Sequence, residues 1–353
     1  MSEQPQVTLE LEPTPANPRN SEGAFADLAD GRIVYSYTHY TGGRADHDPA
    51  YLASRFSADG GRTWTAQDQL LLPNEGRQTT MSVGYLRLSS GELGLCYLVK
   101  HSSSECRAHL RRSADEGQTW SEPVCCVPWA SYHVTNNDRE VQLSSGRIVV
   151  PASEHGAPFT SRGTAYAHYS DDLGASWQSS QRVAPPAAGN SGLQEPLVIE
   201  LRDGRLWMLC RTDLGHQWQA WSEDGGEHWS TAAPAKAFPS PCSPLSMKRI
   251  PETGDLLAVW NDHSGRFPAP PPDTHQANWG RTPLVAAVSR DEGESWQGHR
   301  ALESDFEHGY CYLALHFVPG AVLLAYCAGG PDCGSVLSRT RLRRVPLAWC
   351  YGA

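Results

Sequence analysis

The chain has 353 residues, a formal net charge of −10, 39 % hydrophobic and 19 % charged residues, 32 glycines and 26 prolines. This composition supports a folded core and favours strands and turns over long helices or disorder. The acidic balance argues against binding to nucleic acid or to an anionic membrane surface, because both require a basic field. The length fits two ordinary domains or one large all-β domain.

The sequence contains no run of about 20 apolar residues, as a membrane-spanning helix requires. Its first twenty residues are polar, acidic and proline-containing and do not resemble a secretory signal, so a cytoplasmic location is expected. Ten scattered cysteines, including the adjacent Cys125 and Cys126, fit reduced, buried thiols. Nucleotide-binding and metal-binding motifs are absent, so we expect neither a cofactor nor a metal.

An octapeptide of the form S-x-D-x-G-x-[T/S/H]-W recurs through the chain at intervals of 52 to 67 residues. Its five copies begin at Ser57, Ser113, Ser170, Ser222 and Ser289. The Ser and Asp side chains suit hydrogen bonds to turn amides, the Gly suits a positive φ, and the Trp suits packing between strands. A nearly constant period of this length indicates a repeat architecture, with the octapeptide as a structural turn.

A second repeated feature, an apolar run, a glycine turn and another apolar run, alternates with the octapeptides. Its glycines are Gly31, Gly91, Gly146, Gly204, Gly254 and Gly320. Each repeat therefore predicts four antiparallel strands, A to D, with the glycine between A and B and the octapeptide between C and D. Six such repeats predict an all-β, six-bladed β-propeller as a single domain over residues 1–353.

The sixth repeat lacks the octapeptide, so we expect the chain ends to complete its outer strand. Residues 1–18 form an N-terminal arm with the ring-closing strand near Val7–Leu11, and the C-terminal contribution lies near Arg343–Trp349. The proline run Pro268–Pro272 marks an insertion in the fifth blade.

Strand alternation places the glycine turns and the octapeptides on one face of the propeller. The starts of the A strands and the B–C connections then lie on the opposite face. Arginines, carboxylates and tyrosines gather in exactly those segments of the sequence, which predicts a polar site at that face.

The repeats resemble the Asp-box, or BNR, repeats of the sialidase superfamily, whose fold is a six-bladed propeller. The resemblance covers nearly the whole chain and extends to three spacings. Glu195 and Arg211 lie sixteen residues apart in QEPLVIELRDGRLWMLCR, Arg281 precedes the fifth octapeptide by eight residues, and Asp46 precedes the first by eleven. In bacterial sialidases, residues with these spacings belong to the active site.

Two segments depart from the family pattern. The first family arginine lies in an R-I-P motif, whereas here Arg19 begins RNSEGAFADLADG, with Glu22 placed to orient it. The family's tyrosine matches GYCYLALHF, where Tyr310 aligns best and Tyr312 is the alternative. Strand alternation would put both tyrosines on the same side.

The resemblance implies a retaining exo-glycosidase that removes terminal sialic or related nonulosonic acids from a glycan or glycoconjugate. Tyr310, or Tyr312, would be the nucleophile, with Glu195 as its base and Asp46 as the acid/base. Arg19, Arg211 and Arg281 would bind the substrate carboxylate. Asp262 and His263, with Trp279, would form a rim against the glycerol tail or the aglycone.

Two other functions remain open from the sequence. A polysaccharide lyase or another glycosidase acting on a uronic acid would also need arginines, and a lyase would rely on His263 or His316. A propeller that binds glycans without cleaving them would bind ligand without turnover, although recognition alone does not need Glu195 beside a tyrosine.

Overall fold

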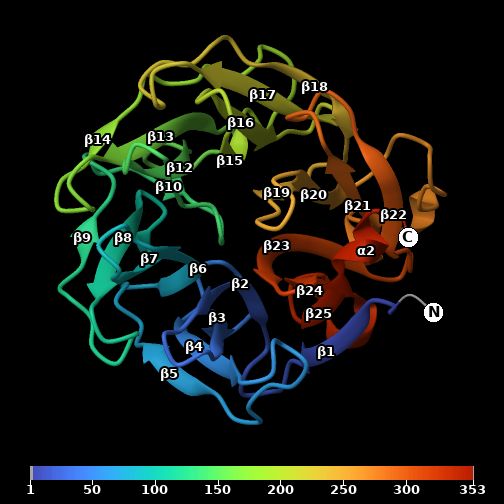
Figure 1. The fold of residues 1–353 in the computed structure, drawn as a ribbon, viewed down its shortest axis with the longest axis horizontal. Helices are drawn as coiled ribbons and strands as arrows, with labels where there is room; N and C mark the ends of the chain where they lie inside the picture. Colours follow the sequence, from blue (N-terminus) through green and yellow to red (C-terminus); the bar gives the residue numbers. More distant parts are fainter. Residues whose placement is uncertain (1–2, 353) are drawn as a thin grey trace.

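A computed structural model describes residues 3–352; residues 1–2 and 353, which the single-domain prediction also covers, lie outside the described residues. In the described part the strands form six antiparallel sheets arranged as blades around a central axis (Figure 1). The prediction of an all-β, six-bladed propeller is confirmed. In every blade the A strand lies nearest the axis (Figure 1), and only in the third is this position divided between two short strands, His133–Val134 and Val141–Gln142.

The strands of the six blades are as follows. The first blade consists of β2 (Asn20–Asp27), β3 (Ile33–Tyr40), β4 (Ala50–Ser57) and β5 (Gln69–Leu72). The second consists of β6 (Thr79–Arg87), β7 (Leu93–Ser102), β8 (Glu105–Ser113) and β9 (Val124–Cys125). The third consists of β10 (His133–Val134), β11 (Val141–Gln142), β12 (Ile148–Glu154), β13 (Thr164–Ser170) and β14 (Gln178–Ser179). The fourth consists of β15 (Gln194–Glu200), β16 (Leu206–Arg211), β17 (His216–Ser222) and β18 (Ala233–Pro239). The fifth consists of β19 (Ser246–Arg249), β20 (Leu256–Asn261), β21 (Leu284–Ser289) and β22 (Gln297–Glu303). The sixth consists of β23 (Gly309–Val318), β24 (Ala321–Gly329), β25 (Thr340–Pro346) and β1 (Gln6–Leu11).

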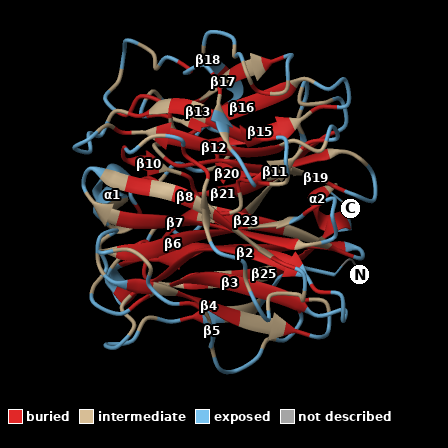
Figure 2. Ribbon diagram, turned by 90° about the vertical axis from the view of Figure 1, so that its left-hand side faces the viewer, coloured by how far each residue is buried: buried red, intermediate tan, exposed pale blue. Residues whose placement is uncertain are grey.

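Helical structure is limited to short segments. The fifth-blade insertion contains η1 (Pro272–Thr274) and α1 (His275–Asn278). In the sixth blade, η2 (Pro331–Cys333) lies between β24 and β25, and α2 (Leu347–Cys350) follows β25. In the described residues, no helix has the length and apolar character needed to cross a membrane. The side view shows buried strands joined by exposed turns, with α1 at one face of the ring and α2 toward the other (Figure 2).

The first and last strands of the chain close the ring in the same blade. β1 pairs antiparallel with β25, and the sheet order is β1-β25-β24-β23. The outer strand is therefore supplied by the N-terminal segment alone. The C-terminal contribution begins earlier than expected, at Thr340, and after Pro346 the chain turns into α2.

The octapeptides form self-contained turns between the C and D strands. In the second copy, the Ser113 hydroxyl donates to Asp115 and accepts from the amide of Gly117, at 2.7 and 2.8 Å. Thr119 donates to Asp115 from its hydroxyl at 2.6 Å and from its amide at 2.8 Å. The hydrogen bonds from Thr119, followed by that from Ser113, lower the pKa of Asp115 to about 2. The carboxylate is thus used by its own turn, as expected for a structural element.

A β-bulge interrupts the innermost strand in four blades. Each bulge contains one non-glycine residue with a positive φ: Glu22 (57°), Ser82 (58°), Glu195 (45°) and Tyr312 (58°). This left-handed conformation is costly for residues with a Cβ, and such residues concentrate at functional sites. A bulge also breaks the alternation of side chains along a strand, which allows it to re-aim one residue.

Candidate active site

A cavity of about 860 Å³ opens on the face that carries the A-strand starts and the B–C connections. All six blades contribute to its lining, and the four bulge residues Glu22, Ser82, Glu195 and Tyr312 all belong to it. The bulges therefore aim their strained residues into one space. The sequence-predicted residues Arg19, Asp46, Arg211 and Arg281 also line this cavity.

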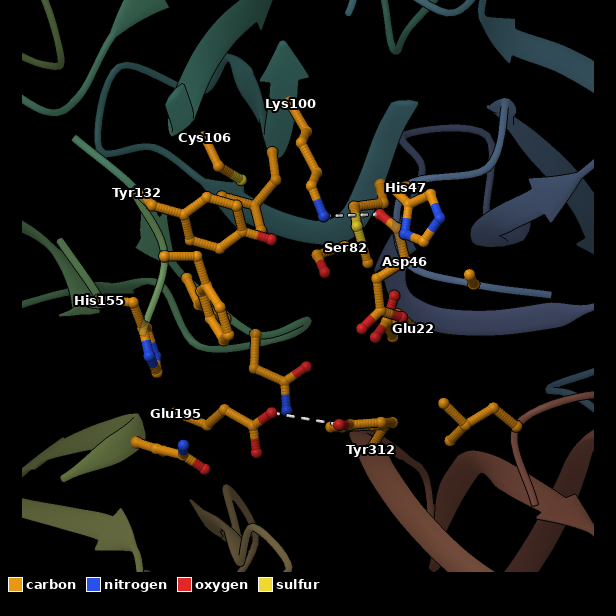
Figure 3. Close-up of a pocket in the computed structure, with 18 of the residues that line it drawn as sticks. Glu22, Asp46, His47, Ser82, Lys100, Cys106, Tyr132, His155, Glu195 and Tyr312 are labelled. Carbon is orange, nitrogen blue, oxygen red and sulfur yellow. Dashed lines mark hydrogen bonds between the residues drawn. The ribbon is translucent and has the colours of Figure 1, made fainter. Parts of the chain in front are cut away.

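Tyr312, Glu195 and Arg211 form a hydrogen-bonded chain. Figure 3 shows its contact between Tyr312 and Glu195 at one side of the cavity. The Tyr312 hydroxyl donates to Glu195 Oε1 at 3.1 Å, and Arg211 Nη1 donates to Glu195 Oε2 at 2.9 Å. Burial and then the Glu195 charge raise the pKa of Tyr312 well above its usual value. Burial acts to raise the pKa of Glu195, but the charge and hydrogen bond of Arg211 hold it below its usual value. A neutral phenol thus donates to an ionised carboxylate.

Arg19 contacts two acidic residues of the first blade, Asp46 and Glu22. Its Nη1 donates to Asp46 Oδ1 at 2.6 Å, and its Nη2 donates to Glu22 Oε1 at 3.4 Å. Arg19 is 1 % exposed, whereas the Asp46 side chain is 62 % exposed and reaches into the open cavity. Burial acts to raise the pKa of Asp46, but the Arg19 charge and hydrogen bond hold it below its usual value.

Arg281 has a different environment from the other two arginines. It is 4 % exposed and forms no ion pair with any carboxylate in the described part of the chain. The guanidinium lies between two aromatic rings, 5.3 Å from the centre of Trp279 and 5.2 Å from that of Tyr312. Its Nη1 donates to Cys311 Sγ at 2.9 Å. Its positive charge is therefore available to a ligand.

Lys100 is a cavity residue that the sequence analysis missed. Its Nζ donates to the Asp46 carbonyl at 3.1 Å and lies 5.0 Å from the centre of the Tyr132 ring (Figure 3). The signal was present in the sequence, because Lys100 lies near the end of a B strand, as Arg211 does in the fourth blade. Tyr132, which approaches the cavity from the second-to-third blade connection, was also missed.

The cavity carries more positive than negative charge near neutral pH. Its buried or half-buried basic groups are Arg19, Lys100, Arg211 and Arg281. Its acidic groups are Glu22, Asp46 and Glu195. Burial is the main cause that raises the pKa of Glu22 to about 8, so this carboxyl is largely protonated at pH 7. The remaining imbalance favours an anionic ligand.

Tyr310 does not line the cavity, contrary to the sequence alignment. It is 2 % exposed and packs in the hydrophobic core between the fifth and sixth blades, beside Tyr326. The expectation that Tyr310 and Tyr312 share one side is wrong, because the bulge between Cys311 and Ala314 turns Tyr312 toward Glu195. Tyr312, the alternative, is the tyrosine of the cavity.

Asp262 and His263 also lie away from the cavity lining. The Asp262 carboxylate is buried against Arg266 at 2.8 Å, and His263 Nε2 lies 3.1 Å from the Thr282 carbonyl. The predicted rim is therefore wrong for both residues, which hold the fifth-blade insertion together. Trp279, from the same insertion, does line the cavity and is 39 % exposed.

No grouping of three or more His, Cys, Asp or Glu side chains between residues 3 and 352 has the arrangement needed to hold a metal ion.

The fold and the cavity define a six-bladed, Asp-box propeller with an arginine-rich pocket on one face. The family model described as "BNR repeat-like domain" matches residues 42–320. The chain belongs to this BNR repeat-like family.

Curated relatives and solved structures agree with this assignment. A sialidase from Micromonospora viridifaciens is 24 % identical over 256 residues, covering 64 % of this chain and 38 % of that protein. Sialidase-3 from Bos taurus is 29 % identical over 133 residues, covering 33 % of this chain and 31 % of that protein. The chain thus spans about a third of the length of the curated relatives it matches.

Among solved structures, a protein of unknown function from Dyadobacter fermentans superposes with a TM-score of 0.74 at 17 % identity, covering 98 % of this chain and all of that one. The NanB sialidase from Streptococcus pneumoniae gives 0.71 at 14 % identity, covering 99 % of this chain and 71 % of that one. A leech intramolecular trans-sialidase gives 0.73 at 14 % identity, covering the whole of this chain and 71 % of that one. These similarities establish the shared fold.

Proposed function

We propose that this protein is a retaining exo-glycosidase that cleaves terminal sialic or related nonulosonic acids from glycans. The observation that carries the proposal is the hydrogen-bonded chain from Tyr312 through Glu195 to Arg211, in a cavity that also contains Arg281, Arg19 and Asp46. The sialidases among its relatives support the same substrate class.

A tyrosine nucleophile suits a sugar whose anomeric carbon carries a carboxylate. A carboxylate nucleophile would be repelled by that group, whereas a neutral phenol would not. Tyr312 is a weak nucleophile while protonated, and Glu195 is ionised and 3.1 Å from its hydroxyl. Glu195 accepts the phenolic proton as Tyr312 attacks the anomeric carbon, and the result is a covalent glycosyl-tyrosine intermediate.

The arginines bind the substrate carboxylate. Arg281 has no acidic partner and supplies an unshared charge, while Arg211 shares its charge with Glu195. Arg19 is paired with Asp46 at 2.6 Å. A substrate carboxylate that binds Arg19 takes this charge away from Asp46. The Asp46 pKa then rises toward its ordinary value, which allows Asp46 to protonate the leaving oxygen and later to activate water.

The experiment is the release of 4-methylumbelliferone from its α-linked N-acetylneuraminic acid glycoside by the wild type, Tyr312→Phe and Tyr310→Phe. We expect turnover by the wild type and by Tyr310→Phe, and strongly reduced turnover by Tyr312→Phe. Tyr310 is the matched control, because it is two positions away and buried in the core. Equal activity of Tyr312→Phe and the wild type contradicts the mechanism.

The same assay separates the other functions considered from the sequence. A glycan-binding propeller would bind the sugar without releasing the fluorophore. A lyase would form an unsaturated product that absorbs in the near ultraviolet. The two histidines that the sequence offered for a lyase do not favour that function, because neither lines the cavity. His263 is hydrogen-bonded to the Thr282 carbonyl, and His316 Nε2 lies 3.0 Å from Asp27. Inactivity across sialic and other nonulosonic acid glycosides overturns the proposal.

A further inference from the structure

Two of the three buried or half-buried cavity arginines donate a hydrogen bond to a cysteine sulfur. Arg281 Nη1 donates to Cys311 Sγ at 2.9 Å, and Arg211 Nε donates to Cys242 Sγ at 3.2 Å. Arg19 differs, because its guanidinium is held by the carboxyl groups of Asp46 and Glu22.

The contact between Arg281 and Cys311 stands out, because Arg281 has few other polar partners. Its guanidinium makes one hydrogen bond among the described residues, and its buried Nε has no partner. The rings of Trp279 and Tyr312 limit the plane of the guanidinium, but an aromatic face does not fix the direction of its N–H groups. Cys311, in β23, is fully buried.

We propose that Cys311 is a positioning residue of the anion-binding site, whose sulfur fixes the direction of Arg281 while leaving the guanidinium charge free for the substrate carboxylate. The inference rests on the proposed function. A carboxylate in place of the thiol would fix Arg281 equally well, but it would neutralise the charge that the substrate needs. Below its pKa, the neutral thiol accepts the hydrogen bond without this cost.

The ionisation of Cys311 adds a measurable consequence. Burial acts to raise the pKa of Cys311, but the hydrogen bond with Cys327 and the charge of Arg281 lower it to about 7. Cys327 lies directly opposite on β24. The charged and titratable groups that act on this pair are Arg281, Tyr312, Glu195, Glu22, Arg19, Tyr35 and Tyr40. Above neutral pH the Cys311 thiolate neutralises Arg281, so the affinity for an anionic ligand falls as the pH rises.

The first test measures binding of the 2,3-didehydro analogue of N-acetylneuraminic acid, and KM and kcat for the fluorogenic sialoside. We expect Cys311→Ala to weaken binding and raise KM about tenfold, the effect of one hydrogen bond to a charged group. Its kcat should change much less. Cys311→Ser keeps an acceptor and should restore affinity to within about threefold of the wild type. Cys350→Ala, a buried cysteine of α2 in the core, is the matched control.

The second test follows the affinity for the same analogue between pH 6 and 8.5. We expect the affinity of the wild type to fall as the pH rises. In Cys311→Ser, the part of this fall that is due to ionisation of Cys311 should be absent. Both proteins are also measured with Glu22→Gln, because Glu22 titrates in the same range. Binding by Cys311→Ala within twofold of the wild type overturns the proposal.

A third measurement separates this proposal from the proposed function. Thiolate absorbance near 240 nm is titrated in the wild type and in Arg281→Met, with Cys311→Ser as the blank for the Cys311 signal. We expect a step near neutral pH that moves to higher pH in Arg281→Met. This result supports the Arg281–Cys311 contact even if no sialoside is bound or cleaved. A step unchanged in Arg281→Met overturns it.

Discussion

The hydroxyl of Tyr312 lies 3.1 Å from the carboxylate of Glu195, although the two residues are 117 positions apart in the chain. Each occupies a β-bulge in the innermost strand of its blade, with a positive φ. The same local distortion, used in two blades, brings the phenol and the carboxylate together. Their pKa values are shifted in opposite directions, which keeps the phenol protonated and the carboxylate ionised in the resting site.

Replacing Glu195 with glutamine removes the group that accepts the phenolic proton while keeping the shape of the side chain. We expect kcat for the fluorogenic sialoside to fall by about 10²–10⁴-fold, the usual contribution of a general base. KM should change less, because Arg281 and Arg19 remain in place. Steady-state kinetics of Glu195→Gln beside Glu154→Gln, a carboxylate outside the cavity lining, measures this. An unchanged kcat in Glu195→Gln would refute the base role.

Asp46→Asn should affect substrates according to their leaving groups. An alcohol leaving group needs a proton, whereas 4-nitrophenolate leaves without one. We therefore expect a loss of about 100-fold or more in kcat/KM for sialyllactose, and a much smaller loss for 4-nitrophenyl sialoside. Asp48→Asn, two residues away in the same loop, serves as the control. Equal losses on both substrates would exclude Asp46 as the proton donor.

Glu22 should make the stability of the folded protein depend on pH. Its pKa is raised from 4.5 to about 8 in the folded protein, mainly by burial. A group with a raised folded pKa contributes stability that is complete below the unfolded pKa and is lost as pH rises through the folded pKa. We expect Glu22→Gln to remove this loss. The Tm of the variant minus that of the wild type should therefore increase between pH 5 and pH 8.5. Thermal unfolding across this range measures the difference, and a constant difference would contradict the raised pKa.

The octapeptide turns should stabilise the fold without contributing to the cavity. The buried Ser170 hydroxyl donates to Asp172 and accepts from the Gly174 amide, both at 2.8 Å. Ser170→Ala leaves this amide without its partner and should lower the free energy of unfolding by about 1–2 kcal/mol. Denaturant unfolding measures the loss, and affinity for the sialic acid analogue should stay constant. Weakened binding would point to a role beyond the turn.

The sequence predicted the blades well because their turns have strong local causes. Each glycine turn and each Asp-box turn depends on residues close in the chain, so a short pattern identifies it. The positions of Arg19, Asp46, Glu195, Arg211 and Arg281 on one cavity followed from strand direction and from the family spacings.

The sequence could not separate Tyr310 from Tyr312: the family pattern favoured Tyr310, and alternation, which assumes a regular strand, placed both on one side, whereas the strand has a bulge between Cys311 and Ala314. Glu22 and Glu195 precede their glycine turns by nine residues, and Tyr312 precedes Gly320 by eight. The same count of nine back from Gly320 falls on Cys311, between the two tyrosines, so it does not separate Tyr310 from Tyr312. The contact between Arg281 and Cys311 has no comparable signal, because it depends on how the fifth and sixth blades pack.

The sixth blade joins the beginning of the chain to its end, since β1 pairs with β25. Tyr312 belongs to β23, the innermost strand of that blade. During synthesis on the ribosome, β1 emerges before β25 and must wait for it before the ring closes. The Tyr312 hydroxyl therefore reaches Glu195 only after the other five blades have been made, so a nascent chain lacks the complete cavity until the sixth blade is added.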